Sequence, residues 1–195
     1  MVTLATERLF LRPFRSADAA EFTRLAGDWA VASMTSDIPY PLARDQAAAW
    51  LSPSRGEVRF AIEFEGQLVG GAGYYRRRSG AAELGFWLGR PWWGQGFATE
   101  ANRAVVRYGF EKTRLAGFTS SHFVDNDASR AVLRKLGFEP VGRGYIISVA
   151  RGHDVEALTY WLGAQQARHI GRSAGRFRSA ARWRAWLGRL GGDSL

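Results

Sequence analysis

Apolar and polar positions alternate along the chain, and the period of the alternation changes several times. A period of two predicts strands over residues 7–14, 58–64, 67–75, 82–88, 117–124, 138–147 and 153–162. A period near 3.6 predicts helices over residues 17–27, 43–51, 98–112 and 128–136. The elements then follow in the order β-α-α-β-β-β-α-β-α-β-β. This order predicts a mixed α/β fold.

Punctuating residues set the limits of these elements. Ser16 is placed to cap the first helix, and Gly137 follows Lys135 as a stop for the last one. Residues 28–42 lack a clear period and contain Pro39-Tyr40-Pro41, so we expect a loop there. Most connections are short and no segment repeats. We therefore expect one domain over residues 1–163, with 164–195 as a separate tail.

Composition narrows the class of protein. With 195 residues of which 46% are hydrophobic, the chain can bury a sizeable core, which excludes wholesale disorder. Cysteine is absent, which excludes disulfides, thiolate metal sites and a cysteine nucleophile. Charged residues interrupt the N-terminal apolar pattern, and no apolar run is long enough for a membrane span. The expectation is a cytoplasmic protein.

The net charge of +9 first suggests a nucleic-acid partner, but it is unevenly distributed. Residues 164–195 hold seven Arg and one Asp, a charge of +6, which leaves +3 for residues 1–163. Arg168, Arg172 and Arg176 recur every fourth residue, as in a basic amphipathic helix. Packing on the domain or on a second subunit, contact with RNA or the ribosome, membrane-surface binding and disorder all remain open for this tail.

A glycine-rich stretch joins the strand at 82–88 to the following helix. Gly94 and Gly96 let the backbone approach a ligand, and the N–H groups of a helix start can cradle a phosphate. The spacing matches neither the P-loop nor the dinucleotide-binding glycine pattern. A turn that only connects strand to helix remains an equal alternative.

A second stretch, residues 125–138, also runs from a strand into a helix. Asn126 is placed as a helix cap, and Ser129 lies in the first turn, where a solvated position is the ordinary interpretation. Neither residue by itself indicates chemistry.

Four segments in this order resemble the GNAT superfamily of acetyl-CoA-dependent N-acetyltransferases. They are residues 6–14, 82–88, 93–101 and 126–138. The closer resemblance is to the branch that acetylates the N-terminal amine of ribosomal proteins. It covers residues 3–162 and excludes the tail. It implies the GNAT fold, a central and mostly antiparallel sheet with one splayed strand and flanking helices.

The resemblance implies acetyl-CoA as co-substrate and no metal. The turn at 93–98 would wrap the pyrophosphate, and the strand at 86–88 would hydrogen-bond the pantetheine arm. Trp93 stands where the family often has Arg or Gln, which removes one side-chain phosphate contact. The implied cofactor-binding residues are Phe86, Trp87, Leu88, Trp93, Gly94, Gln95, Gly96, Phe97, Ala98, Thr99, Asn126 and Arg130.

Acetyl transfer to an amine needs a base, and a carboxylate suits this role. Glu83 is the candidate because alternation places it on the face of Trp87; an exposed strand glutamate is the alternative. Many relatives place a Tyr acid where this chain has Leu133, and the resemblance to the ribosomal-protein branch implies Ser129 as its substitute. A reaction without any acid is the alternative, because a thiolate is already a good leaving group. Trp29 and Tyr40 are expected near the acceptor, with ordinary loop packing as the alternative.

Three functions follow as hypotheses. The first is acetylation of a protein N-terminus, most naturally of a ribosomal protein. A small amine, such as an aminoglycoside or a metabolite, is the alternative acceptor. A CoA- or RNA-binding module without catalysis is the third, since Leu133 replaces the usual Tyr. The oligomeric state stays open between monomer and homodimer.

Two other patterns carry no function. Residues 171–175 match the G-x-S-x-G nucleophile pattern, but no strand precedes them. His122, His153 and His169 are too far apart to form a metal-ligand motif.

Overall fold

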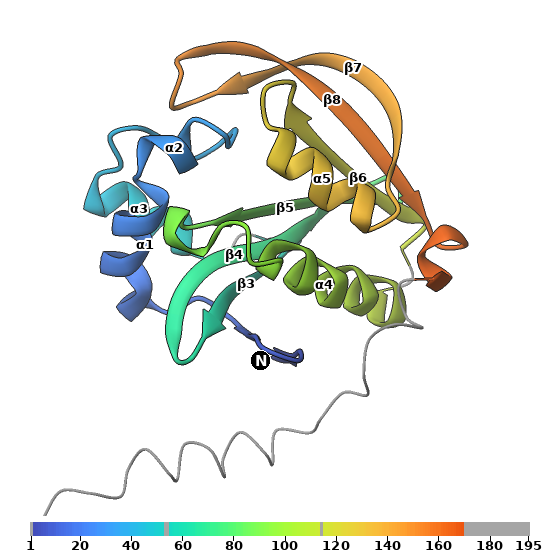
Figure 1. The fold of residues 1–195 in the computed structure, drawn as a ribbon, viewed down its shortest axis with the longest axis horizontal. Coiled ribbons are helices and arrows are strands. Elements are labelled where there is room, and N and C mark those ends of the chain that lie inside the picture. The colour runs from blue at the N-terminus through green and yellow to red at the C-terminus, as the bar shows by residue number, and fades with distance from the viewer. Residues whose placement is uncertain (1, 53–54, 114, 170–195) are drawn as a thin grey trace, which may run out of the picture.

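One mixed sheet organises the computed structural model, which describes residues 2–52, 55–113 and 115–169 (Figure 1). Its eight described strands lie in the order β1-β2-β3-β4-β5-β6-β8-β7. Their bounds are β1 Leu4–Ala5, β2 Phe10–Arg12, β3 Glu57–Phe64, β4 Gln67–Arg76, β5 Ala82–Leu88, β6 Gly117–Phe123, β7 Glu139–Ser148 and β8 His153–Gly163. Among these strands only the β5–β6 pair is parallel, so the sheet is mostly antiparallel, as expected.

Helices cover both faces of this sheet. The described α-helices are α1 Ala19–Ala26, α2 Trp29–Ala32, α3 Arg44–Leu51, α4 Phe97–Thr113 and α5 Asp127–Lys135, and the 3-10 turns are η1 Ser16–Asp18, η2 Arg90–Trp92 and η3 Gln166–His169. Side-chain alternation along β5 assigns the faces. Leu84 and Leu88 belong to the core beneath α4 and α5, whereas Trp87 packs in a second core with residues of α1, α2 and α3.

Most predicted elements are confirmed within a residue or two. The turn between β3 and β4 has positive φ at both Glu65 (50°) and Gly66 (80°), as a tight hairpin requires. Gly137 has φ of 80° directly after α5, which ends the helix as predicted.

Three predictions at the N-terminus were wrong. The strand predicted over 7–14 is reduced to β2, and β1 precedes it as the other arm of a hairpin. Ser16 lies inside η1 and does not cap it. Arg15 is the residue before η1, and its N–H donates to the Asp18 carboxylate at 2.7 Å. The loop expected over 28–42 contains the short helix α2, whose first N–H groups are capped by Asp28.

Arg12 of β2 is a buried charge in the sheet. Its side chain is about 95% buried and donates to both oxygens of Asp18 at 2.7 Å and to Glu63 at 2.6 Å. Burial alone would raise the pKa of Asp18, but the hydrogen bonds from Arg12 and from the Arg15 N–H outweigh it and lower that pKa. The ion pair fixes η1, and with it α1, against β2 and β3.

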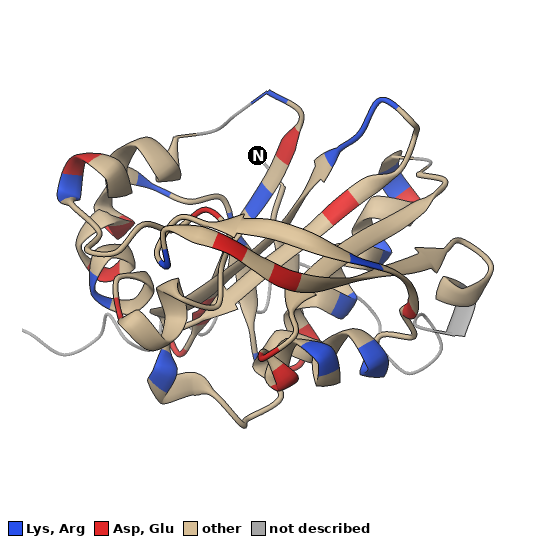
Figure 2. Ribbon diagram, turned by 90° about the horizontal axis from the view of Figure 1, so that it is seen from above, with Lys and Arg blue, Asp and Glu red and all other residues tan. Residues whose placement is uncertain are grey.

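The described part of the basic tail is short. β8 ends at Gly163, whose N–H donates to Gln166 at 2.7 Å as η3 begins. Residues 170–195, on which the predicted amphipathic helix falls, lie outside the described residues. Along the described elements, acidic and basic residues are interspersed, apart from the run Arg76-Arg77-Arg78 where β4 ends (Figure 2). None of the described helices combines the length and apolarity needed to cross a membrane.

Candidate functional site

A gap opens in the middle of the sheet between β5 and β6. The two strands pair only at their beginnings, through Ala82 with Phe118 and Glu83 with Thr119. The Ser120 hydroxyl then donates to the Leu84 carbonyl at 2.9 Å, and beyond that point the strands diverge. The splayed strand implied by the resemblance is therefore present, and β5 is one edge of the gap.

The backbone of β5 presents hydrogen-bonding groups to this gap. The Gly89 N–H donates to the Val69 carbonyl on β4. The backbone N–H and C=O groups of every second residue back from Gly89 therefore point toward β4, and those of the residues between them point toward β6. Phe86 belongs to the second set, because Leu84 and Leu88 use their carbonyls on that side. Its N–H and C=O point into the gap, past the last β5–β6 pair. An extended amide-containing ligand can pair with such an edge.

The glycine turn lies at the end of β5. Gly94 and Gly96 have φ of 76° and 81°, which L side chains rarely adopt, and α4 begins one residue later at Phe97. A Cβ on Gly94 would meet no atom within 4 Å, so the positive φ is what requires glycine there. The exposed turn and the start of a 17-residue helix form a cradle for an anion.

Trp93 stands where the family often has Arg or Gln, and its side chain bonds back to the end of β5. Its Nε1 donates to the Leu88 carbonyl at 2.8 Å, and the side chain is still 45% exposed. This bond ties the turn to the end of β5. The side chain thus has a structural task in the turn.

Arg8 lies beside the glycine turn, and the sequence analysis assigned it no role. Its Nη1 donates to the Gln95 carbonyl at 3.0 Å, and its guanidinium stacks 4.7 Å from the Phe97 ring centroid. It also pairs with Glu100 at 2.7 Å. The Thr6-Glu-Arg segment supports the family resemblance, but only the fold shows that β1–β2 reaches the turn. The structure therefore adds a cation next to Gly96.

Glu100 holds this arrangement from the first turn of α4. Its carboxylate accepts from the Thr6 hydroxyl at 2.6 Å and from the Arg8 N–H at 2.9 Å. Burial acts to raise the pKa of Glu100, but the bonds from Thr6 and Arg8 prevail and lower it. The carboxylate is thus built to stay ionised.

The start of α5 forms the opposite edge of the gap. Asn126 caps the helix, since its Oδ1 accepts the Ser129 N–H at 3.0 Å, and its Nδ2 donates to the Met34 carbonyl at 3.4 Å. The capping role is therefore confirmed. The half-buried Ser129 hydroxyl has no hydrogen-bond partner among the described residues. Leu133 is fully buried in the main core, so this position supplies no polar group.

Glu83 lies at the closed end of the gap, opposite Tyr75 on β4 and Thr119 on β6. Its side chain is 38% exposed and pairs with Arg77 of the β4–β5 turn. Alternation places it on the face of Trp87, where α1, α2 and α3 lie.

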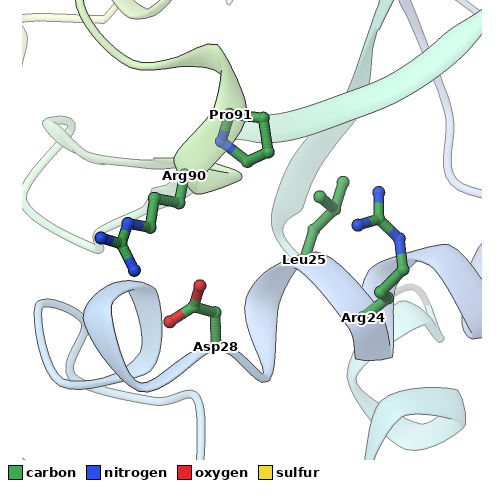
Figure 3. Close-up of a pocket in the computed structure, with 5 residues that line it drawn as sticks. All are labelled: Arg24, Leu25, Asp28, Arg90 and Pro91. Atoms are coloured by element: carbon green, nitrogen blue, oxygen red, sulfur yellow. The ribbon is translucent and has the colours of Figure 1, made fainter.

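Segment 28–42 stands over the same face near the open end. Trp29 and Tyr40 pack edge to face with ring centroids 5.0 Å apart, and each is 48% exposed. Beside them is a pocket of about 400 Å³ lined by Arg24, Leu25, Asp28, Arg90 and Pro91. The Asp28 carboxylate and the Arg90 guanidinium extend toward each other across this pocket (Figure 3).

The fold thus sorts the predicted residues into groups. The residues at 86–88, the turn at 93–99 and Asn126 all meet around the open end of the gap. Arg130 is exposed on α5 and pairs with Asp127 at 2.9 Å. Glu83 and Ser129 belong to opposite faces of the sheet, and the gap separates β5 from the strand that leads to Ser129. No group of three or more potential metal ligands occurs within residues 2–52, 55–113 and 115–169.

Known proteins share both the sequence pattern and the fold. The acetyltransferase (GNAT) domain model matches residues 8–139. The chain is 30% identical over 171 residues to the N-acetyltransferase p20 of Bacillus licheniformis, covering 83% of this chain and 96% of p20. It is 36% identical over 62 residues to the proposed ribosomal N-acetyltransferase YdaF of Bacillus subtilis, or 32% of this chain and 34% of YdaF.

A solved structure of Mycobacterium smegmatis RimJ with CoA-disulfide superimposes with a TM-score of 0.75 at 23% identity, covering 96% and 95% of the two chains. Other structures of this fold were solved with acetyl-CoA or CoA bound. The exposed glycine cradle and the unpaired edge of β5 suit the pyrophosphate and the amide-bearing arm of that molecule. The chain belongs to the GNAT family, and it is an acetyl-CoA-dependent N-acetyltransferase.

Proposed function

We propose that this enzyme acetylates the α-amine of a protein N-terminus, with ribosomal proteins as the first candidates. The proposal rests on the observation that β5 and β6 diverge beyond the Glu83–Thr119 pair, with the glycine turn at the end of β5. The exposed Trp29–Tyr40 pair lies beyond the same end of the gap, where we place the entrance for the acceptor. The likeness to RimJ and to YdaF supports the acceptor class.

In the proposed reaction acetyl-CoA supplies the acetyl thioester and leaves as CoA. Glu83 removes a proton from the incoming ammonium, directly or through water, so that the amine is nucleophilic. The Phe86 N–H is available in the gap to stabilise negative charge on the reacting carbonyl oxygen. The Ser129 hydroxyl, which has no hydrogen-bond partner among the described residues, is available to donate to the departing sulfur.

The test uses peptides that all carry one internal Lys and differ only in whether the N-terminus is free or blocked. Peptides beginning with Ser or Ala are mixed with acetyl-CoA and the enzyme, and CoA release and peptide mass are followed. Matched peptides with a blocked N-terminus and one internal Lys are the controls. The proposal expects acetylation of the free α-amine only. Turnover on the internal Lys alone, or on small amines with no peptide acetylated, would overturn it.

The cellular form of the proposal places the enzyme in the cytoplasm, where nascent ribosomal proteins occur. Mass spectrometry of N-termini from cells with and without the protein identifies the acceptor. The charge of +6 on residues 164–195 supports a separate proposal, contact with ribosomal RNA. A chain ending at residue 169 should then lose RNA affinity and keep peptide turnover.

A further inference from the structure

Four consecutive carbonyl groups fasten the segment after α2 to the far side of the gap. The carbonyls of Ser33, Met34, Thr35 and Ser36 accept from Arg151 Nε (2.7 Å), Asn126 Nδ2 (3.4 Å), the Ser148 hydroxyl (3.4 Å) and the Val149 N–H (3.1 Å), respectively. All four donors come from the β6–α5 junction or from the end of β7 and the turn after it. Residues 33–36, which we call the α2 strap, therefore belong to the β6 side.

The other end of this segment belongs to the β5 side. Val31 and Ala32 are buried in the core that contains Trp87 of β5, and Asp28 faces Arg90 just beyond β5. Figure 1 shows α2 between α1 and the ends of β6 and β7. The segment from Asp28 to the α2 strap thus crosses the open end of the gap on the face opposite α4 and α5.

Arg151 makes the largest share of the contacts that hold the strap. Besides Ser33, it donates to both oxygens of Asp125 at 2.8 and 3.2 Å and to the Met34 sulfur at 3.4 Å. Its guanidinium lies 5.1 Å from the Phe123 ring centroid at the end of β6. The Arg151 side chain is only 15% exposed, which protects its bond to Ser33, whereas Asp125 is 49% exposed and its bonds to Arg151 are open to water.

We propose that Arg151 is a positioning residue for the acceptor: it locks the α2 strap to the β6–α5 junction and so sets the width of the acceptor entrance. This inference rests on the proposed function, because it assumes that the acceptor enters past segment 28–42. Arg151 need not touch either substrate. Its planar guanidinium engages Asp125 and Ser33 at once, which one lysine ammonium cannot reproduce.

The test is Arg151→Met in the full chain, with Arg143→Met as matched control. Arg143 lies on β7, in the same β7–β8 hairpin as Arg151. It pairs with Glu156, and its side chain is 65% exposed. We expect Arg151→Met to raise the KM for a Ser-terminated peptide about tenfold, with the KM for acetyl-CoA unchanged. Arg151→Lys should recover part of this loss, and Arg143→Met should behave as the parent enzyme.

Two further readouts do not depend on the acceptor. In Arg151→Met, the amide hydrogens of residues 33–35 should exchange faster with solvent. These amides donate to carbonyls of α2, and we expect those hydrogen bonds to open more often when the strap is released. A wider entrance should also raise the slow hydrolysis of acetyl-CoA by water. If the parent enzyme acetylates no peptide, the proposed function fails, and these two readouts still decide the role of Arg151.

One set of results would overturn the inference. In that set, Arg151→Met has a lowered melting temperature. Its peptide KM, its amide exchange and its acetyl-CoA hydrolysis all equal those of Arg143→Met. Arg151 would then only stabilise the fold. Should Arg151→Met fail to fold, Asp125→Asn removes the ionic partner alone and is measured in its place.

Discussion

The two sides of the gap are built in different ways. On the cofactor side, strand end, glycine turn and helix start are contiguous, from Leu88 to Ala101, and Arg8 is added from β1–β2. On the acceptor side, segment 28–42 meets the β6–α5 junction and the turn after β7, with contacts between residues 92 and 118 positions apart. A local site needs few long-range contacts to form, whereas the acceptor entrance depends on the whole sheet.

This contrast explains how the two sides can vary. The proposed phosphate cradle is made of backbone amides, so it tolerates Trp93 in place of Arg or Gln. The acceptor entrance that we propose is defined by side chains such as Trp29 and Arg151, so we expect each substitution there to change it. We therefore expect changes to the turn to affect acetyl-CoA, and changes to the entrance to affect the amine.

The largest effect should come from Glu83→Gln, because Glu83 is the proposed general base. Loss of the proposed base should lower kcat by about a hundredfold or more. The KM for acetyl-CoA should stay unchanged, since Glu83 faces the acceptor side. Steady-state kinetics over a pH series measures both constants. Restoration of the rate at high pH would support the base role, and a parent-like kcat at neutral pH would contradict it.

Gly94→Ala tests the cofactor side alone. Positive φ costs a non-glycine residue about 1–2 kcal/mol, so the KM for acetyl-CoA should rise roughly tenfold while the peptide KM stays constant. Gly80→Ala is the matched control, because its φ of 84° is similar and a Cβ there also meets nothing within 4 Å. Equal losses of acetyl-CoA affinity in both variants would mean that the turn acts only through general stability.

Glu100→Gln tests whether the β1–β2 hairpin supports the turn. The pKa of Glu100 is lowered in the folded enzyme, so its contribution to stability is present above its unfolded pKa of about 4.3 and is lost as the pH falls through the folded pKa. The melting temperature of the parent enzyme should therefore fall in this acidic range more than that of the variant. Asp18, whose pKa is also lowered, remains in both proteins.

At neutral pH the same variant should raise the KM for acetyl-CoA only a few-fold, because Arg8 still reaches Gln95. Parallel acid-unfolding curves for parent and variant would contradict the role assigned to Glu100.

Trp29→Ala should give the smallest effect and touch the acceptor side only. The ring is half exposed, so we expect stability to change by less than about 0.5 kcal/mol. The peptide KM should rise about threefold, through loss of an aromatic contact surface. Trp93→Ala, equally exposed but bonded to Leu88, is the contrasting variant and should change acetyl-CoA binding. A peptide KM unaffected by Trp29→Ala would remove this residue from the entrance.

The sequence by itself determined most of the elements and the glycine turn. Period-two and helical patterns are local, and Gly94, Gly96 and Gly137 mark backbone conformations that only a short stretch of chain decides. It could not show that Arg12 is buried, since its partners Asp18 and Glu63 are brought together by η1 and β3. Nor could it show Arg8 at the turn or Arg151 against the α2 strap. Apart from the Arg12–Asp18 pair, six positions apart, these contacts join residues 51 to 118 positions apart, and no periodicity carries that information. Tertiary structure alone decided them, because the fold places β1 against α4 and the turn after β7 near α2.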